Sequence, residues 1–236
     1  MSRVQTSTVT SQAPSQVGYS HIFSNNKMSA GLNALCALFC LIAFTLFMVA
    51  LVGHSCSQSV IRDTYWVYAG DGANDYFGTR CSFVETVGPT SSVINYEATE
   101  CVGDYCDSCA AFGNTAFGLN IVAIAFTTIS LGLCWGAATE PNKDSSISNI
   151  VMSFLAFAAS LIGTVLFMSR CYSEINNQFG TSVAQWGPGS VLSLVGLILM
   201  GLVSLLQVID VVTMKEDALR AGPTTYAASG SPARVR

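Results

Sequence analysis

Cysteine offers the most distinctive chemistry in this chain. Nine cysteines occur among 236 residues, and six of them lie in two segments that separate apolar runs. These six are Cys56, Cys81, Cys101, Cys106, Cys109 and Cys171. An even set of thiols is typical of disulfides in an oxidising compartment, although spacing alone does not fix which cysteines pair.

The spacing Cys101-x4-Cys106-x2-Cys109 also matches three ligands of plant-type iron–sulfur clusters, with Cys81 or Cys56 as a fourth thiolate. Thiols outside the cell oxidise, and the intervening residues are not the small ones that such clusters favour. We therefore expect disulfides, with no metal and no cofactor.

The segment 54–115 is acidic, since eight carboxylates oppose Arg62 and Arg80. A surface of this kind is either a solvated anionic face or an attraction for a cation or a basic partner. The carboxylates are Asp63, Asp71, Asp75, Glu85, Glu97, Glu100, Asp104 and Asp107. No catalytic motif or phosphate loop accompanies them. A net charge of −4 argues against a nucleic-acid partner, so we expect neither an enzyme nor a nucleic-acid-binding protein.

Four apolar segments must position these loops. Charged residues make up 10% of the chain and mean hydropathy is +0.49, whereas soluble domains carry about 25% charged residues. A helix of about 20 apolar residues crosses a bilayer. The alternative is that the four segments are core helices of a soluble protein. We reject it because none of them has a polar face for water. We expect an all-α membrane fold, a bundle of four transmembrane helices at 31–53, 116–138, 148–169 and 189–213.

An even number of spans places both termini on one side of the membrane. Basic residues are more numerous in 1–30, 139–147 and 214–236 than in the other connecting segments, and no cysteine lies in these three. We therefore expect cytosolic tails at 1–30 and 214–236, a cytosolic loop at 139–147, and extracellular loops at 54–115 and 170–188. The expected location is the plasma membrane.

The longer outer loop favours β-structure. Aromatic and β-branched runs predict strands at 65–68, 76–87 and 93–96. A sheet of this size buries too little apolar surface to be stable alone, so we expect disulfides to stabilise it. We expect Cys81 to pair with Cys101, closing the second strand onto the third, and Cys171 can tie the second loop to the sheet.

Two polar residues fall within the last span. Gln207 and Asp210 are three residues apart and share a helix face. An intramembrane carboxylate is costly and often functional, as in a transporter or proton pathway. The alternative is that Asp210 lies at the membrane interface near Lys215, where a charge is tolerated.

Small residues at helix-packing spacing occur in the third span, as Ala159-x3-Gly163 and Ser160-x3-Thr164. They allow helices to approach closely, either within the bundle or at a dimer face. Cys134 lies nearest the cytosolic surface among the cysteines of the spans. It is a candidate for palmitoylation or else a small buried apolar residue.

The layout of spans and loops resembles that of the claudin/PMP22 superfamily, which includes the amastin-like surface proteins. Trp66 and Cys81 stand where claudins carry their first Trp and first Cys, and Phe77-Gly78-Thr79-Arg80 stands in place of Gly-Leu-Trp. The run Phe117-Gly118-Leu119-Asn120 is similar to the amastin entry into the second span. The resemblance implies the same architecture and a Cys81–Cys101 pairing.

These features predict a non-enzymatic membrane protein that acts in adhesion, barrier formation or membrane-coat assembly. Its partners would be the lipid bilayer and other membrane proteins or further copies of itself, through lateral contacts and the outer loop. An accessory subunit of a channel, transporter or larger complex is the alternative, and a small transporter using Asp210 is a third.

Overall fold

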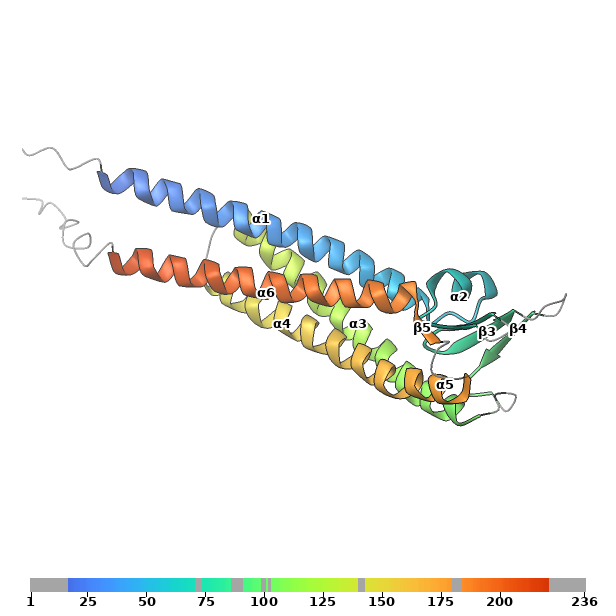
Figure 1. Cartoon of the computed structure of the whole chain (residues 1–236). Coiled ribbons are helices and arrows are strands. Elements are labelled where there is room, and N and C mark those ends of the chain that lie inside the picture. The colour runs from blue at the N-terminus through green and yellow to red at the C-terminus, as the bar shows by residue number, and fades with distance from the viewer. Residues whose placement is uncertain are drawn as a thin grey trace, which may run out of the picture.

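The computed structural model describes residues 17–70, 74–85, 91–98, 101, 103–139, 143–179 and 184–220. These residues form an elongated four-helix bundle with a small antiparallel sheet at one end (Figure 1). The first helix begins and the last helix ends at the opposite end of the bundle. We refer to these as the sheet end and the distal end.

The bundle consists of α1 (Val17–Val52), α3 (Asp104–Thr139), α4 (Lys143–Leu166) and α6 (Pro188–Arg220). Each helix packs against two neighbours in the cyclic order α1, α3, α4, α6. All four contain a stretch long and apolar enough to cross a membrane, which confirms the four predicted spans.

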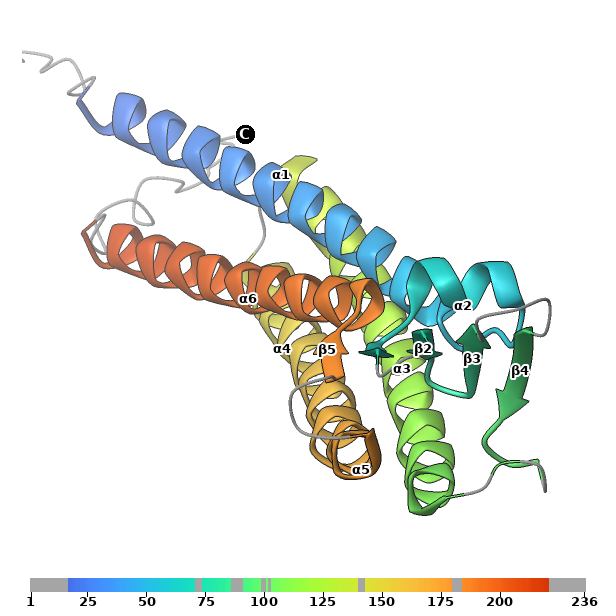
Figure 2. The same ribbon diagram turned by 45° about the vertical axis from the view of Figure 1, so that its right-hand side comes forward.

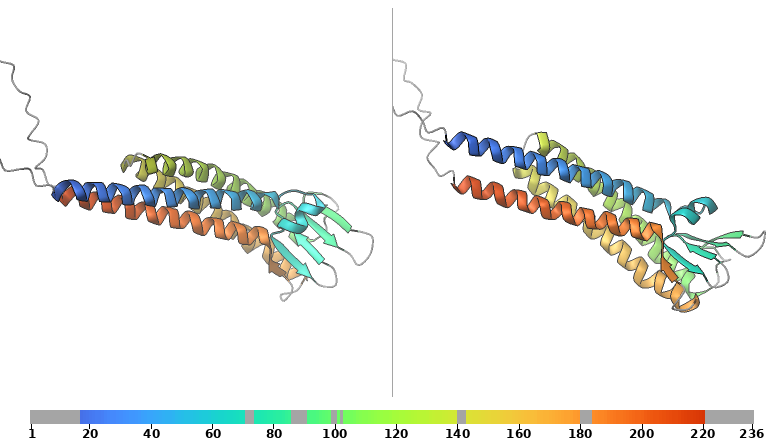
Figure 3. Two further views of the ribbon diagram at one scale, coloured as in Figure 1. Left: turned by 90° about the horizontal axis from the view of Figure 1, so that it is seen from above. Right: turned by 45° about the horizontal axis from the view of Figure 1, so that its top comes forward.

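The helices are longer than the predicted spans. At the distal end α1 and α6 extend beyond α3 and α4 (Figure 3). At the sheet end α3 already begins at Asp104, so its first turns belong to the segment expected to be a loop. The expected tails are therefore partly helical, and their outermost parts, 1–16 and 221–236, lie outside the described residues.

The bundle is apolar outside and partly polar inside. Leu38, Phe154 and Trp135 are 51%, 56% and 67% exposed on its surface. In contrast, Asn33 and Ser153 are fully buried between the helices. A water-soluble domain has the reverse arrangement, whereas hydrocarbon solvates the outer face and leaves polar groups to bond one another. The chain is an integral membrane protein whose outer face contacts lipid.

The sheet has five strands in the order β4-β3-β2-β1-β5, and all neighbouring strands are antiparallel. Four strands come from the segment between α1 and α3, and β5 comes from the segment between α4 and α6 (Figure 2). Their bounds are β1 Val67–Gly70, β2 Asn74–Phe77, β3 Cys81–Glu85, β4 Ser91–Asn95 and β5 Ala184–Trp186.

The predicted strand at 76–87 is wrong in one respect, because a turn at 78–80 divides it between β2 and β3. Three short helical segments complete the sheet end: α2 (Gln58–Thr64), the π-helix η1 (Phe167–Cys171) and α5 (Tyr172–Phe179). The first of these covers β3, where Ile61 packs against Cys81 and Phe83. Neither α2 nor β5 was expected from the sequence.

Candidate functional site at the two ends of the bundle

Trp66 fixes the sheet to the bundle. It immediately precedes β1 and is fully buried. Its indole Nε1–H donates to the carbonyl of Ala50 in α1 at 3.2 Å. Its ring meets Phe167 of η1 edge-on, with centroids 5.0 Å apart, and Gly189 of α6 allows the backbone to pass close to it. One side chain therefore joins three helical segments to the sheet.

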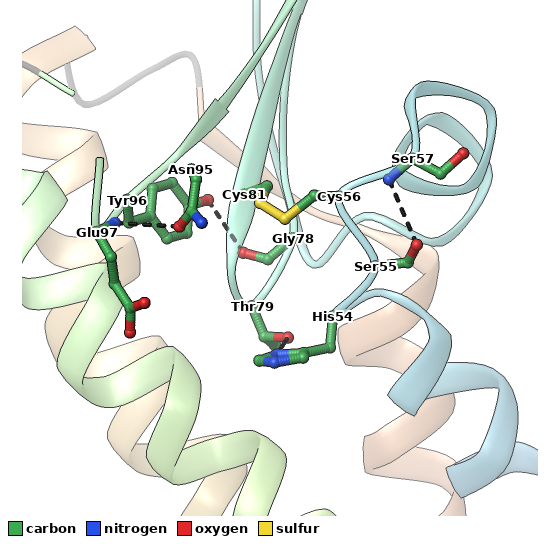
Figure 4. The surroundings of a disulfide bond; sticks show 10 residues. All are labelled: His54, Ser55, Cys56, Ser57, Gly78, Thr79, Cys81, Asn95, Tyr96 and Glu97. Carbon is green, nitrogen blue, oxygen red and sulfur yellow. Dashed lines mark hydrogen bonds between the residues drawn. A yellow bond between two sulfur atoms is a disulfide. The ribbon is translucent and has the colours of Figure 1, made fainter. Parts of the chain in front are cut away.

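The turn at 78–80 provides a second attachment, shown in Figure 4. The hydroxyl of Tyr96 donates to the carbonyl of Gly78 at 3.0 Å, and His54 Nδ1 lies 3.2 Å from Thr79 Oγ1. Gly113 of α3 touches the Thr79 carbonyl so closely that a Cβ could not be accommodated there. The turn is thus held between the ends of α1 and α3.

Burial in this region shifts two ionisable groups. Loss of solvent, and secondarily the charge of Arg80, lower the pKa of His54. Burial also raises the pKa of Tyr96 well above its usual range. Both shifts favour the neutral forms that the hydrogen bonds of this turn use.

Three disulfides join the six cysteines predicted to form them. The bonds are Cys56–Cys81, Cys101–Cys106 and Cys109–Cys171, with Cα atoms 5.4, 5.9 and 4.6 Å apart. The expected Cys81–Cys101 bond is wrong, because α2 lies over β3 and the chain before it brings Cys56 to Cys81. Cys171 does tie the second loop to the first, as the sequence allowed.

Because of these disulfides, the three cysteines with ferredoxin-like spacing have no free thiols to bind a cluster. Cys101 and Cys106 are bonded to each other, and Cys109 is bonded to Cys171 on a different helical segment. Within the described part of the chain, no group of three or more His, Cys, Asp or Glu side chains is arranged to hold a metal ion.

The acidic residues of the first loop do not share one environment. Asp63, Asp107 and Glu97 are exposed, and Glu97 accepts a hydrogen bond from Asn114 at 2.7 Å. Asp75 instead lies on β2 with 8% of its surface exposed, and burial raises its pKa. Asp71 and Glu100 lie outside the described residues, as do the side chains of Glu85 and Asp104.

Polar side chains from three helices meet at the distal end. Asn33 Nδ2 donates to Asp210 Oδ2 at 3.3 Å, and Ser146 Oγ donates to the same oxygen at 3.4 Å. Gln207 Nε2 donates to Asn33 Oδ1 at 2.7 Å. We call Asn33, Ser146, Gln207 and Asp210 the distal polar cluster. All four are buried, so the carboxylate faces the bundle interior, and the side chain of Lys215 lies outside the described residues.

The three free cysteines lie on α1 and α3, and Cys36 is next to the distal polar cluster. Cys134 of α3 is within hydrogen-bonding reach of both Cys36 and Cys40 of α1. Asn149 Nδ2 donates to Cys134 Sγ at 2.8 Å, and Ser130 bonds to Asn149 in turn. All three thiols are fully buried. Acylation of Cys134 would therefore require the helices to separate.

The small residues of α4 pack within the bundle. Gly163 faces Ala116 and Leu119 of α3, and Ala159 belongs to the buried core between the helices. The hydroxyls of Thr164 and Ser160 lie 3.0 and 3.5 Å from Ser193 Oγ of α6. These side chains hold α4 to its neighbours and do not form a separate exposed stripe.

The interior polar residues of α4 were missed by sequence reasoning, which followed the apolar pattern alone. Ser146, Asn149 and Ser153 are all buried. Their spacing of three and four residues places them on one helix face. A search for polar periodicity within an apolar span would have found them.

Comparison with known proteins does not add to this description. No protein-family model matches the chain, and no curated protein matches it either.

Proposed function

We propose that this multi-pass membrane protein is not an enzyme and acts at the cell surface, assembling adhesive or barrier layers through its sheet. Three disulfides lie at the sheet end, and the free cysteines lie within the bundle. This distribution supports a plasma-membrane orientation with the sheet outside and both termini in the cytosol. It also supports the resemblance to the claudin/PMP22 superfamily layout.

The observation that carries the proposal is the edge of the sheet at β4. This strand is the last in the sheet order and pairs only with β3 among the described strands. Its sequence, Ser-Ser-Val-Ile-Asn, contains no charge and no proline, the usual means of protecting an exposed edge. Val93 at its centre is 36% exposed. Such an edge can accept a strand from a second copy.

The sheet is also held firmly enough to present that edge. Trp66 bonds it to α1, and the Cys109–Cys171 bond joins α3 to η1 at the sheet end. Copies embedded in one membrane would therefore carry their β4 edges in similar orientations. The acidic first loop would disfavour close approach of two copies unless a cation or a basic partner lies between them.

Cross-linking on intact cells tests this proposal. In an antiparallel pair of β4 strands the central residues approach each other, so Val93→Cys should give disulfide-linked dimers under mild oxidation. Gln185→Cys is the control, because Gln185 is exposed on β5 at the opposite edge of the sheet. Dimers from both variants or from neither would contradict pairing through β4.

A charged residue introduced on the β4 edge gives a second test. Val93→Lys should prevent two differently tagged copies from co-purifying in mild detergent, while the protein still reaches the cell surface. If self-association persists, the β4 edge is not the contact. If only a larger unlike chain co-purifies, and does so regardless of the substitution, the protein is an accessory subunit.

A further inference from the structure

The distal polar cluster holds a carboxylate inside the membrane-spanning part of the bundle. Asp210 is 2% exposed and belongs to the apolar stretch Pro188–Met214. An ionised carboxylate in such surroundings is costly unless a positive charge or several hydrogen bonds compensate it. The nature of its surroundings therefore indicates what else must bind there.

The hydrogen bonds between members of the cluster run towards Asp210, and Asn33 Nδ2 also donates to the carbonyl of Ser29 at 3.0 Å. Gln207 donates to Asn33, Asn33 donates to Asp210, and Ser146 donates to the same carboxylate oxygen. This direction orients the donors as an ionised, acceptor-only carboxylate requires. Among the described residues, every group that bonds the carboxylate is neutral, so these bonds solvate the negative charge but do not balance it.

One further oxygen in the cluster lacks a hydrogen-bond donor in the described part of the chain. Gln207 is fully buried, and its Oε1 has no hydrogen-bond partner among the described residues, although its Nε2 is bonded to Asn33. A buried amide oxygen without a partner is destabilising, because it has lost its hydrogen bond to water. Because Gln207 and Asp210 share a helix face, the unsatisfied oxygen and the carboxylate lie on the same side of α6.

The spans offer no positive side chain to balance this charge. The stretches 29–52, 105–139, 145–166 and 188–214 contain no Lys, Arg or His. Among the described side chains, the ionisable group that faces the cluster from α1 is the thiol of Cys36, and α4 contributes the hydroxyl of Ser146. The side chain of Lys143, at the start of α4, lies outside the described residues. A thiol supplies no positive charge in either protonation state.

We propose that the distal polar cluster is a binding site for a monovalent cation, either a proton or an alkali-metal ion. Asp210 supplies the charge, and Gln207 Oε1 supplies a second oxygen. Oxygen donors of this kind suit hard cations. Asn33 is a positioning residue that holds the other two in place.

Labelling with dicyclohexylcarbodiimide in native membranes tests the site on the full chain. The reagent is apolar and adds to a protonated carboxyl: the O–H adds across one C=N bond, and acyl migration leaves a stable N-acylurea. We expect the mass increment at Asp210, and less of it at higher pH because the reagent needs the protonated acid. Asp210→Asn should abolish this increment, whereas Asp107→Asn, at an exposed position of α3, should leave it unchanged.

Comparing sodium chloride with choline chloride separates the two cations. Protection by sodium at constant pH, lost in Gln207→Leu, identifies an alkali-ion site. Dependence on pH alone identifies a proton site. Labelling that is absent at every pH, or that does not change with pH, would overturn the proposal. Exposure of the buried thiols to a maleimide shows whether each variant is folded.

Discussion

Replacement of Trp66 should destabilise the bundle as well as the sheet. The side chain is fully buried and contacts α1, η1 and α6 around one indole ring. Truncating a buried Trp to Ala costs about 3–5 kcal/mol, through lost packing and the cavity that remains. We expect Trp66→Ala to lower the free energy of unfolding by this amount.

The hydrogen bond contributes only part of that loss. Trp66→Phe keeps most of the ring but removes the Nε1–H, whose net worth is about 1 kcal/mol. The carbonyl of Ala50 retains the backbone N–H of Gly53 at 3.3 Å, so the substitution leaves no orphaned acceptor. We therefore expect Trp66→Phe to cost about 1–2 kcal/mol, well below the alanine variant.

The native thiols provide the assay. Cys36, Cys40 and Cys134 are fully buried in the bundle, so a fluorogenic maleimide reacts with them only when the helices separate. Thermal melting in detergent, read through this reaction, should rank wild type above Trp66→Phe and Trp66→Ala lowest. Trp186→Ala is the matched control, since Trp186 is 50% exposed on β5 and should change little.

Two results would refute this reasoning. If Trp66→Ala melts like the wild type, Trp66 does not join the sheet to the bundle. If Trp66→Phe is as damaging as Trp66→Ala, the hydrogen bond and not the packing dominates.

Three further predictions follow from other contacts. Burial raises the pKa of Asp75, so its stabilising contribution is present at low pH and is lost as pH rises through the raised pKa; Asp75→Asn should raise the melting temperature at neutral pH but not at acid pH. Gly163→Leu should disrupt the α3–α4 contact and lower the free energy of unfolding by about 1–3 kcal/mol, measured as thiol exposure at a lower temperature. An equal effect from Gly163→Ala would count against a steric cause. Replacing Cys109 and Cys171 by Ser opens a loop with a sequence separation of 62 and should cost at most about 4 kcal/mol; unchanged melting would mean that the bond does not form.

The spans were predictable because hydrophobicity along the chain is a local property. A run without charge that is long enough to cross the bilayer forms a helix regardless of its neighbours. The sharing of one helix face by Gln207 and Asp210 followed from their spacing for the same reason. Which way that face points depends on how α6 is rotated against α1 and α4, and an almost wholly apolar helix carries little information about this rotation.

The sheet end was harder to predict because its contacts are distant in sequence. Cys81 bonds with Cys56 since α2 folds over β3, and no pattern within the loop indicates that fold. Strand β5 has only three residues, Ala184–Trp186, and is a strand because it pairs with β1. Such short strands lack the alternation on which prediction relies.

The central claim is that four helices cross the membrane and carry the sheet on the face opposite to the termini. Single cysteines introduced at Ser92 on β4 and at Thr139 at the far end of α3 test it directly, since both residues are exposed. An impermeant maleimide applied to intact cells should label Ser92→Cys, and should label Thr139→Cys only after permeabilisation. Labelling of both positions in intact cells would contradict the claim, and labelling of Thr139→Cys alone would contradict the proposed extracellular position of the sheet.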